Sequence, residues 1–434
     1  MLVVQNIWWL LVLIGVMILI HELGHFWAAR FFDVRVEAFS FGFGPRLFGF
    51  RRGETDFRFS AILFGGYVKM TGEQPGEGVN DPRAFSSKPR WQRLIIAFAG
   101  PAMNIILAVA LLTGLFMVEY PRLANYDQPA TIGYVQRDSP AWQAGLREGD
   151  RIVQVGDMAD PRWEDVVLRE ITSAGKPLPI GYVRDGQRAH TNVVPVLDPN
   201  GVGSAGWEEQ NDVQIAGILP GMDAERKGLK KGDVLVGLNG QPIRSMAKLH
   251  EIIRNASGKP VLVSYRRGQN VHETTITPSW AQADSRWMIG VQLERPVVIT
   301  QLSFPDAVRE SVKQNVRSAS VIYQFLQGLV ERRMSAKSLE GPIGIARISG
   351  DAARQGPMAY FSVMAMVSLN LAVFNLLPIP ILDGGLILML LIEMIMRRDM
   401  SLGFKEAIFR AGMVFLMAVV VFVLYNDISK LLPG

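Results

Sequence analysis

An unbroken apolar run fills positions 7–20 and leads directly into the sequence His21-Glu22-Leu23-Gly24-His25. The run reads as the first part of a transmembrane helix. Residues four apart share one face of a helix, so His21 and His25 can hold one side of a tetrahedral zinc ion. Glu22, beside them, is placed to act as general base on a water molecule at that metal. Ionisable groups are costly in a bilayer, which makes these three residues functional candidates.

The alternative interpretation of this motif is a helix end that leaves the membrane, with polar residues marking the interface. The chain contains only five histidines in 434 residues. A chance His-Glu-x-x-His is therefore improbable, on the order of one per cent or less for this composition. The sequence favours the metal site.

The composition indicates membrane spans joined to folded soluble parts. Hydrophobic residues make up 49% of the chain, too many for an ordinary soluble enzyme and too few for a pure transporter. The net charge of +5 is mild, and the basic residues lie beside apolar segments, which indicates membrane orientation and not nucleic-acid binding. The absence of cysteine excludes disulfides and thiolate ligands. The N-terminus lacks a basic region and a small-residue cleavage site, so we expect a retained span.

Four apolar stretches predict the topology, at roughly 4–32, 94–118, 358–396 and 408–424. Lys and Arg are concentrated between the first two stretches and between the last two, which makes both connections cytoplasmic. The N-terminus, the long insert and the C-terminus are then external. At 1.5 Å per residue the His-Glu-x-x-His motif lies about 20 Å into the first helix, toward its cytoplasmic end.

Residues 38–70 alternate apolar and polar positions, with glycines at turns and a plausible hairpin turn at Arg52-Gly53-Glu54-Thr55. We expect a small β-hairpin sheet folded against the membrane beside the first helix. It is either a plain cytoplasmic hairpin or an edge, within 57–69, that pairs with an extended substrate. The sequence leaves both open.

The external insert contains an internal repeat. The sequence of residues 139–152, which includes Ala-Gly-Leu-x-x-Gly-Asp, recurs at residues 223–235. This pattern resembles bacterial PDZ domains, which bind extended peptides by adding a strand to a sheet edge.

From Phe304 to Leu339 the chain is amphipathic, and helices there would lie either between the PDZ pair and the membrane or on the soluble domain as ordinary solvated helices.

The third apolar stretch is too long for one simple span and is broken by two prolines and two glycines around Asp383. Asp383 is the carboxylate at this break, at the depth inferred for His21 and His25. It is the expected third metal ligand, with a fourth position left for water. The alternative is that Asp383 caps a helix beginning at Gly384.

In the second span, Asn104 is expected to bond to a neighbouring helix.

Together, His-Glu-x-x-His in the first span, Asn-x-x-Pro-x-Pro-x-Leu-Asp-Gly in a late span and PDZ repeats between them resemble the site-2 protease family of intramembrane zinc metalloproteases. The resemblance implies a zinc endopeptidase of the bacterial inner membrane. Its substrate would be a single-pass membrane protein such as an anti-sigma factor, already shortened outside the membrane. The PDZ pair would exclude uncut substrates. The residues implied to hold the unwound substrate are Asn370, Asn375, Pro378 and Pro380.

The expected fold is a multi-span α-helical membrane protein with about four transmembrane helices and a membrane-associated β-hairpin sheet, plus two external PDZ-like α/β domains in tandem. The expected segments are a first transmembrane helix at 1–32, a β region at 33–92, a second helix at 93–120, PDZ domains at 121–205 and 206–297, external amphipathic helices at 298–356, a third transmembrane region at 357–396, a cytoplasmic loop at 397–406, and a fourth helix with an external C-terminus at 407–434.

Two other classes of protein fit the sequence less well than the enzyme does. A PDZ-bearing membrane scaffold would carry a structural metal site, which needs four protein ligands, and the sequence supplies three. An ion-coupled transporter with a broken helix would need a repeat among its spans, whereas the repeat here lies in the soluble insert.

Overall fold

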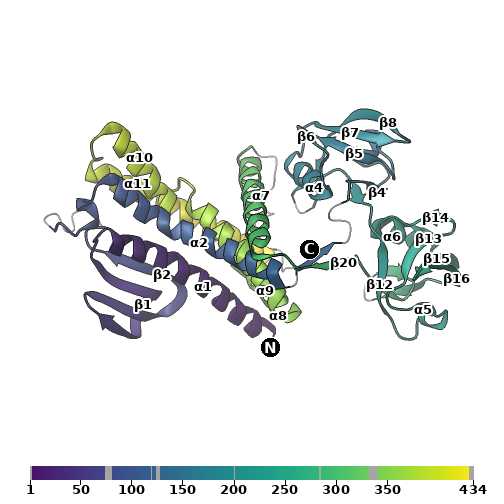
Figure 1. The fold of residues 1–434 in the computed structure, drawn as a ribbon, viewed down its shortest axis with the longest axis horizontal. Helices are drawn as coiled ribbons and strands as arrows, with labels where there is room; N and C mark the ends of the chain where they lie inside the picture. Colours follow the sequence, from purple (N-terminus) through teal and green to yellow (C-terminus); the bar gives the residue numbers. More distant parts are fainter. Residues whose placement is uncertain are drawn as a thin grey trace. The chain divides into compact units, whose positions relative to one another are not determined.

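A computed structural model of the chain describes residues 2–73, 81–118, 120–123, 128–199, 201–282, 285–331 and 341–429. Contacts divide these into two compact units. The first, which we call the helical unit, contains the described residues within 1–120, 301–323 and 339–434. The second, the insert unit, contains those within 121–300 and 324–338. Figure 1 shows the elements of both.

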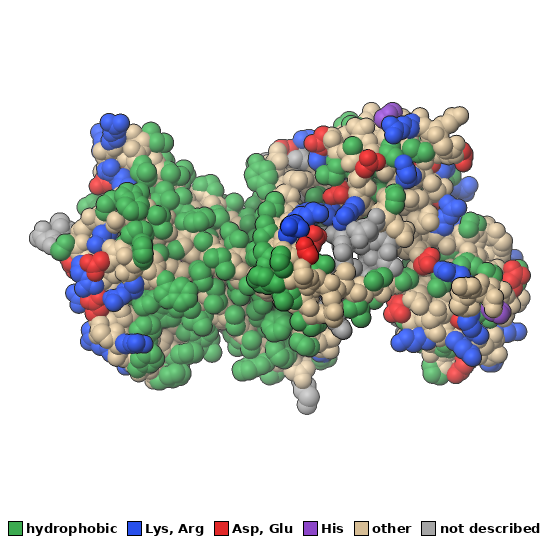
Figure 2. All heavy atoms as spheres, in the orientation of Figure 1, with side chains coloured by type: hydrophobic (Ala, Val, Ile, Leu, Met, Phe, Trp, Pro, Cys, Tyr) green, Lys and Arg blue, Asp and Glu red, His purple; other side chains and the backbone are tan. Residues whose placement is uncertain are grey.

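The helical unit contains four helices that are long and apolar enough to cross a membrane, as the sequence predicts. They are α1 (Leu2–Phe31), α2 (Arg90–Val118), α9 (Pro357–Asn375) and α11 (Leu402–Ser429). Large hydrophobic side chains stay exposed along them, especially on α11, and hydrophobic atoms cover most of the visible face of this unit (Figure 2). Apolar exposure of this extent marks a lipid or protein contact surface.

The third apolar stretch forms two helices. Helix α9 ends at Asn375, and α10 (Asp383–Met396) begins after seven intervening residues. The break follows from the sequence, because Pro378 and Pro380 cannot donate helical hydrogen bonds. The fourth apolar helix, α11, starts at Leu402, inside the loop expected at 397–406.

Two further described helices are α7 (Phe304–Val330), whose residues 304–323 belong to the helical unit, and α8 (Pro342–Gln355). Both fall in the segment expected to hold amphipathic helices. Ala352 of α8 packs with Leu13 and Met17 of α1 in one buried cluster. Helix α8 is therefore part of the packed helical unit.

The sheet beside α1 is more folded than a simple hairpin. Strands β1 (Val36–Arg52) and β2 (Thr55–Met70) are antiparallel, and the predicted turn joins them with Gly53 at φ 63°. Both strands bend, so that β1 residues 38–41 pair on one side with β2 residues 66–69 and on the other with β2 residues 56–59. Residues 57–59 also pair with β1 residues 48–50 and are therefore interior, and the free edge of the predicted 57–69 strand lies at its end, from Gly66 onward.

The insert unit contains two similar modules related by an offset of 83 residues. We call residues 130–209 the first module and residues 213–294 the second. Asp150 of the first accepts hydrogen bonds from Arg184 and from the N–H of Arg147. Asp233 of the second accepts the same bonds from Arg267 and from the N–H of Lys230. The sequence repeat is therefore a repeat of structure.

The first module contains β4 (Ile132–Val135), α3 (Pro140–Gln143), β5 (Arg151–Val155), β6 (Met158–Ala159), α4 (Trp163–Thr172), β7 (Leu178–Arg184), β8 (Gln187–Val193), β9 (Val196–Leu197), β10 (Gly203–Ser204) and β11 (Trp207–Glu209). Strands β6-β5-β7-β8 form its main sheet, and β11 pairs with β4. The ring of Trp207 belongs to the core of this module. The boundary expected between residues 205 and 206 therefore falls inside the first module.

The second module contains β12 (Val213–Ile218), α5 (Asp223–Arg226), β13 (Val234–Leu238), β14 (Gln241–Pro242), α6 (Met246–Ala256), β15 (Val261–Arg267), β16 (Asn270–Ile276), β17 (Ser279–Ala281), β18 (Arg286–Met288) and β19 (Val291–Glu294). Its sheet has the order β16-β15-β13-β12-β19. The β19–β12 pairing corresponds to β11–β4 in the first module, with Val291 opposite Ile218 where Trp207 is opposite Val135. Beyond the modules, β3 (Tyr120–Leu123) pairs with β20 (Val297–Thr300).

The first module differs from the second by a buried acid. Glu170 of α4 is 8% exposed and accepts hydrogen bonds from the N–H of Ala205, at 2.6 Å, and from the indole N–H of Trp207, at 2.7 Å. Burial raises the pKa of Glu170 from 4.5 to about 7, because removal from water disfavours the charged form more than the two donors favour it.

We expect the first module to lose stability as the pH rises, because deprotonation leaves a buried negative charge on Glu170. The folded state keeps this proton at pH values where the unfolded chain has lost it, so stability is highest below pH 4.5 and falls up to about pH 7. The whole effect is at most about 3 kcal/mol. Amide exchange of residues 203–209, corrected for intrinsic rates, should accelerate over this range relative to residues 289–294. Glu170→Gln should abolish this acceleration of exchange with pH. If wild type and Glu170→Gln showed the same pH dependence at residues 203–209, Glu170 would not be the group responsible.

Candidate metal centre

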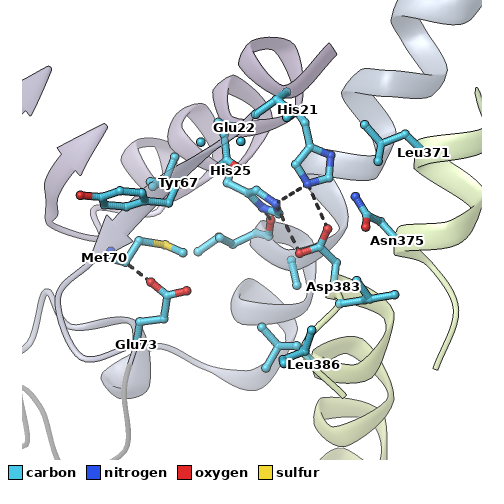
Figure 3. Close-up of a pocket in the computed structure, with 18 of the residues that line it drawn as sticks. His21, Glu22, His25, Tyr67, Met70, Glu73, Leu371, Asn375, Asp383 and Leu386 are labelled. Atoms are coloured by element: carbon cyan, nitrogen blue, oxygen red, sulfur yellow. Dashed lines mark hydrogen bonds and ion pairs between the residues drawn. The ribbon is translucent and has the colours of Figure 1, made fainter. Parts of the chain in front are cut away.

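Helix α1 brings both histidines of the motif to one buried face. His21 and His25 are 7% and 8% exposed, and their Nε2 atoms lie 3.2 Å apart. Asp383, the first residue of α10, reaches them from a segment more than 350 positions away. Its Oδ2 lies 3.1 Å from His21 Nε2 and its Oδ1 lies 3.4 Å from His25 Nε2 (Figure 3). The structure thus brings together the three residues named as ligands.

These three side chains fit a zinc ion. One donor atom from each residue lies within 4.8 Å of the others. Among the described residues, these three form the group of side chains that could hold a metal ion. Zinc takes nitrogen and oxygen donors at about 2.0–2.2 Å in a tetrahedron, so its ligand atoms lie about 3.3 Å from one another. His21 Nε2 lies 3.2 Å from His25 Nε2 and 3.1 Å from Asp383 Oδ2, close to that spacing, and the other carboxylate oxygen, Oδ1, lies 3.4 Å from His25 Nε2.

Asp383 does not cap its helix. The residue before the first turn of α10 is Leu382, and no side chain caps that helix end. The Asp383 carboxylate is directed at the two imidazoles instead (Figure 3). The capping interpretation of Asp383 is therefore wrong for this structure.

Helix α2 closes the site behind the histidines. The carbonyl oxygen of Ile96 accepts a hydrogen bond from His25 Nδ1 at 2.8 Å. The side-chain amide of Asn104 lies 3.2 Å from His21 Nδ1. Between them, a Cβ atom on Gly100 would lie 2.3 Å from His25 Nε2 and 2.8 Å from His21 Nε2. Only glycine leaves room for both rings at this position.

A cavity of about 420 Å³ opens beside the site. Glu22 lines it together with the three candidate ligands, and Gly66, Tyr67, Val68 and Met70 of the β2 edge line another part. A Cβ on Gly66 would lie 3.3 Å from Glu22 Cγ, so the sheet edge passes close to the candidate base. Glu73, which the sequence did not single out, also lines the cavity and accepts the N–H of Met70 (Figure 3).

The residues expected to hold substrate do not all reach this cavity. Asn375, the last residue of α9, lines it near Asp383 (Figure 3). Asn370, Pro378 and Pro380 are not among its lining residues. Pro380 packs instead against Gly412 of α11, where an added Cβ would lie 2.6 Å from the proline Cβ.

Comparison with known proteins gives matches over almost the whole chain. The model of the family described as Peptidase family M50 matches residues 9–419. A protein of Neisseria meningitidis with a zinc metalloprotease name is 30% identical, with 96% of this chain and 97% of that protein covered. A Xylella fastidiosa protein, also with a zinc metalloprotease name, is 31% identical, with 98% of each covered. The regulator of sigma-E protease RseP of Escherichia coli K12 is 29% identical, with 97% of this chain and 98% of that protein covered.

Among solved structures, the PDZ domain of an SdrC-like protein from Listeria monocytogenes is 19% identical. The match covers 19% of this chain and 87% of that domain, with a TM-score of 0.18. That score is too low to support a conclusion about the modules.

Proposed function

This chain belongs to peptidase family M50, the family of site-2 proteases, and we propose that it is a zinc-dependent endopeptidase that cuts single-pass membrane proteins within the bilayer. The observation that carries the proposal is the meeting of His21, His25 and Asp383 beside Glu22, on helices of membrane-crossing length and composition. The zinc metalloprotease names of the relatives support the same metal and reaction.

The proposed ligands are Nε2 of His21, Nε2 of His25 and a carboxylate oxygen of Asp383. A zinc ion in this site supplies Lewis-acid activation of water and of the scissile carbonyl. Glu22 takes the proton from the attacking water and passes it to the leaving amine nitrogen. Asn375, on the cavity wall, donates its amide N–H to the carbonyl oxygen as negative charge develops there.

A helical substrate must unwind before its peptide bond can enter the cavity, because its carbonyls are otherwise held in helical hydrogen bonds. The edge of β2 from Gly66 to Met70 lines the cavity and pairs with β1 on its other side. We propose that the unwound substrate adds to this edge as a strand, which replaces the backbone bonds lost on unwinding.

We propose that the two modules are PDZ domains that admit substrates already shortened outside the membrane. The duplicated fold and the Ala-Gly-Leu-x-x-Gly-Asp pattern support this assignment. The distribution of Lys and Arg supports an orientation with the modules in the periplasm of an inner-membrane protein and the metal site toward the cytoplasm. The name of the E. coli relative, a regulator of sigma-E, supports an anti-sigma factor as the substrate class.

A membrane scaffold with a structural metal site is the competing function. A structural zinc site is closed by four protein ligands. Among the described residues the cluster offers three, and it opens on a cavity large enough for peptide. Both features favour catalysis.

Reconstitution in liposomes tests the proposed function. We expect the full chain to cleave a single-pass substrate with a trimmed external domain, to spare the untrimmed form, and to lose activity on chelation until zinc is restored. Deletion of residues 128–296 should keep cleavage of the trimmed substrate and extend it to the untrimmed one. Failure of the zinc-loaded full chain on the trimmed substrate would contradict the endopeptidase. Loss of that cleavage in a folded deletion variant would contradict only the filter.

A further inference from the structure

One face of α2 supports both candidate histidine ligands. Ile96, Gly100 and Asn104 are spaced four residues apart and therefore share that face. The Ile96 carbonyl bonds to His25, Gly100 makes room for both rings, and the Asn104 amide contacts His21. The support is asymmetric, because His25 is held by a backbone atom and His21 by a side chain.

The bond from His25 fixes its tautomer. A carbonyl oxygen can only accept, so His25 Nδ1 carries the proton and its Nε2 presents a lone pair to the cluster. A metal ligand needs this arrangement, in which the outer nitrogen donates to a fixed acceptor. His21 can bind the same ion through Nε2 only if its own Nδ1 proton also has an acceptor.

Asn104 is the residue beside that nitrogen. It is fully buried, at 0% exposure, and its amide lies 3.2 Å from His21 Nδ1. Its Oδ1 has no hydrogen-bond partner among the described residues. The two ends of an amide are nearly equal in shape, and a half-turn of the group places Oδ1 against His21 Nδ1. The amide can thus serve either tautomer of His21, as a donor in one orientation and an acceptor in the other.

From this geometry we propose that Asn104 is a positioning residue for the metal site. By accepting the Nδ1–H of His21 on Oδ1, it directs the His21 Nε2 lone pair toward the position of the metal. The inference rests on the proposed function, since it takes zinc as the ion bound. It gives Asn104 a role beyond joining two helices, which its backbone carbonyl already does by accepting a hydrogen bond from Ser368 at 2.9 Å.

The test is the zinc affinity of purified full-length variants, measured by competition with a chromophoric chelator. Asn104→Leu and Asn104→Ala remove the acceptor and should bind zinc about 10–100-fold more weakly, the usual cost of losing an outer partner of a metal-bound histidine. Asn104→Asp keeps an acceptor at the same reach and should stay close to wild type. Ser368→Ala removes the neighbouring hydroxyl without touching the amide and should leave zinc affinity unchanged.

A second readout is the visible spectrum of the cobalt-substituted protein, which reports ligand geometry. It should change in Asn104→Leu and Asn104→Ala and be restored in Asn104→Asp. Wild-type affinity in the Ala and Leu variants would overturn the proposal, as would an equal loss in the Asp variant, which would indicate packing alone. A wild-type protein that holds no zinc would instead overturn the proposed function. The Leu and Ala replacements differ in size, so that one remains informative if the other fails to fold.

Discussion

Replacing Glu22 by Gln should slow cleavage of a trimmed membrane substrate by at least about 100-fold while leaving zinc content unchanged. The two side chains have nearly the same shape, but the amide cannot accept a proton. Loss of a general base alone typically costs about 10²–10⁴ in rate. Glu22 is adjacent to His21 on α1, 100° around the helix, and it is not part of the group of candidate ligands. The variant should therefore still bind metal and trap substrate.

The measurement combines zinc content, substrate co-purification and cleavage rate on one preparation. Zinc loss in Glu22→Gln would make Glu22 a ligand and would require a different mechanism. Glu73 provides the comparison, because it is the other glutamate lining the cavity. If Glu22→Gln cleaved at the wild-type rate and Glu73→Gln did not, the base would be Glu73.

The sequence predicts the part of this site that depends on local periodicity. His21 and His25 share a face because they are four residues apart on a helix, and the apolar run before them establishes that helix. The sequence indicates Asp383 by a weaker argument, which is that its inferred depth in the membrane is similar to that of His21 and His25. Apolar stretches of known length set the depth of a residue in a bilayer, and the structure has Asp383 beside both histidines, while its role as a metal ligand stays a prediction. The prediction of the family is confirmed by the match over residues 9–419.

The sequence does not predict how α2 supports the two histidines. At Ile96 the helix offers a carbonyl oxygen to His25, and at Gly100 the lack of a side chain leaves room for both rings. Neither has a chemical signature in sequence. The four-residue spacing of Ile96, Gly100 and Asn104 predicts that they share one face of α2, but helical periodicity does not indicate which element packs against that face.

Non-local strand pairing explains the other differences. Both arms of the predicted hairpin bend, so that one stretch of β1 pairs with two stretches of β2. Gly42 and Gly49 allow this with positive φ angles of 93° and 156°, but glycine marks a turn or a bulge without distinguishing them. Likewise, β11 follows the expected end of the first PDZ domain and completes it by pairing back to β4. Pairings of this kind depend on the whole fold.

Asp383→Ala should lose zinc more completely than any of the Asn104 variants. Asp383 supplies one of three proposed ligands and the only negative charge among them. Its removal leaves two neutral imidazoles, so the cost should exceed the roughly 10–100-fold that follows from losing an outer partner. Elemental analysis should give about one zinc per chain for wild type and almost none for the variant, with cleavage lost in parallel.

Asp399→Asn is the matched control for this experiment. Asp399 follows α10 at its other end and pairs with Arg90, so the change removes a carboxylate from the same part of the chain without touching the cluster. It should retain zinc. Unchanged zinc in Asp383→Ala would mean that the two histidines and a group outside the cluster hold the ion. Glu22, moved from base to ligand, is the candidate for that group. The double variant Glu22→Gln with Asp383→Ala distinguishes this case, since it would lose the zinc that the single variant had kept.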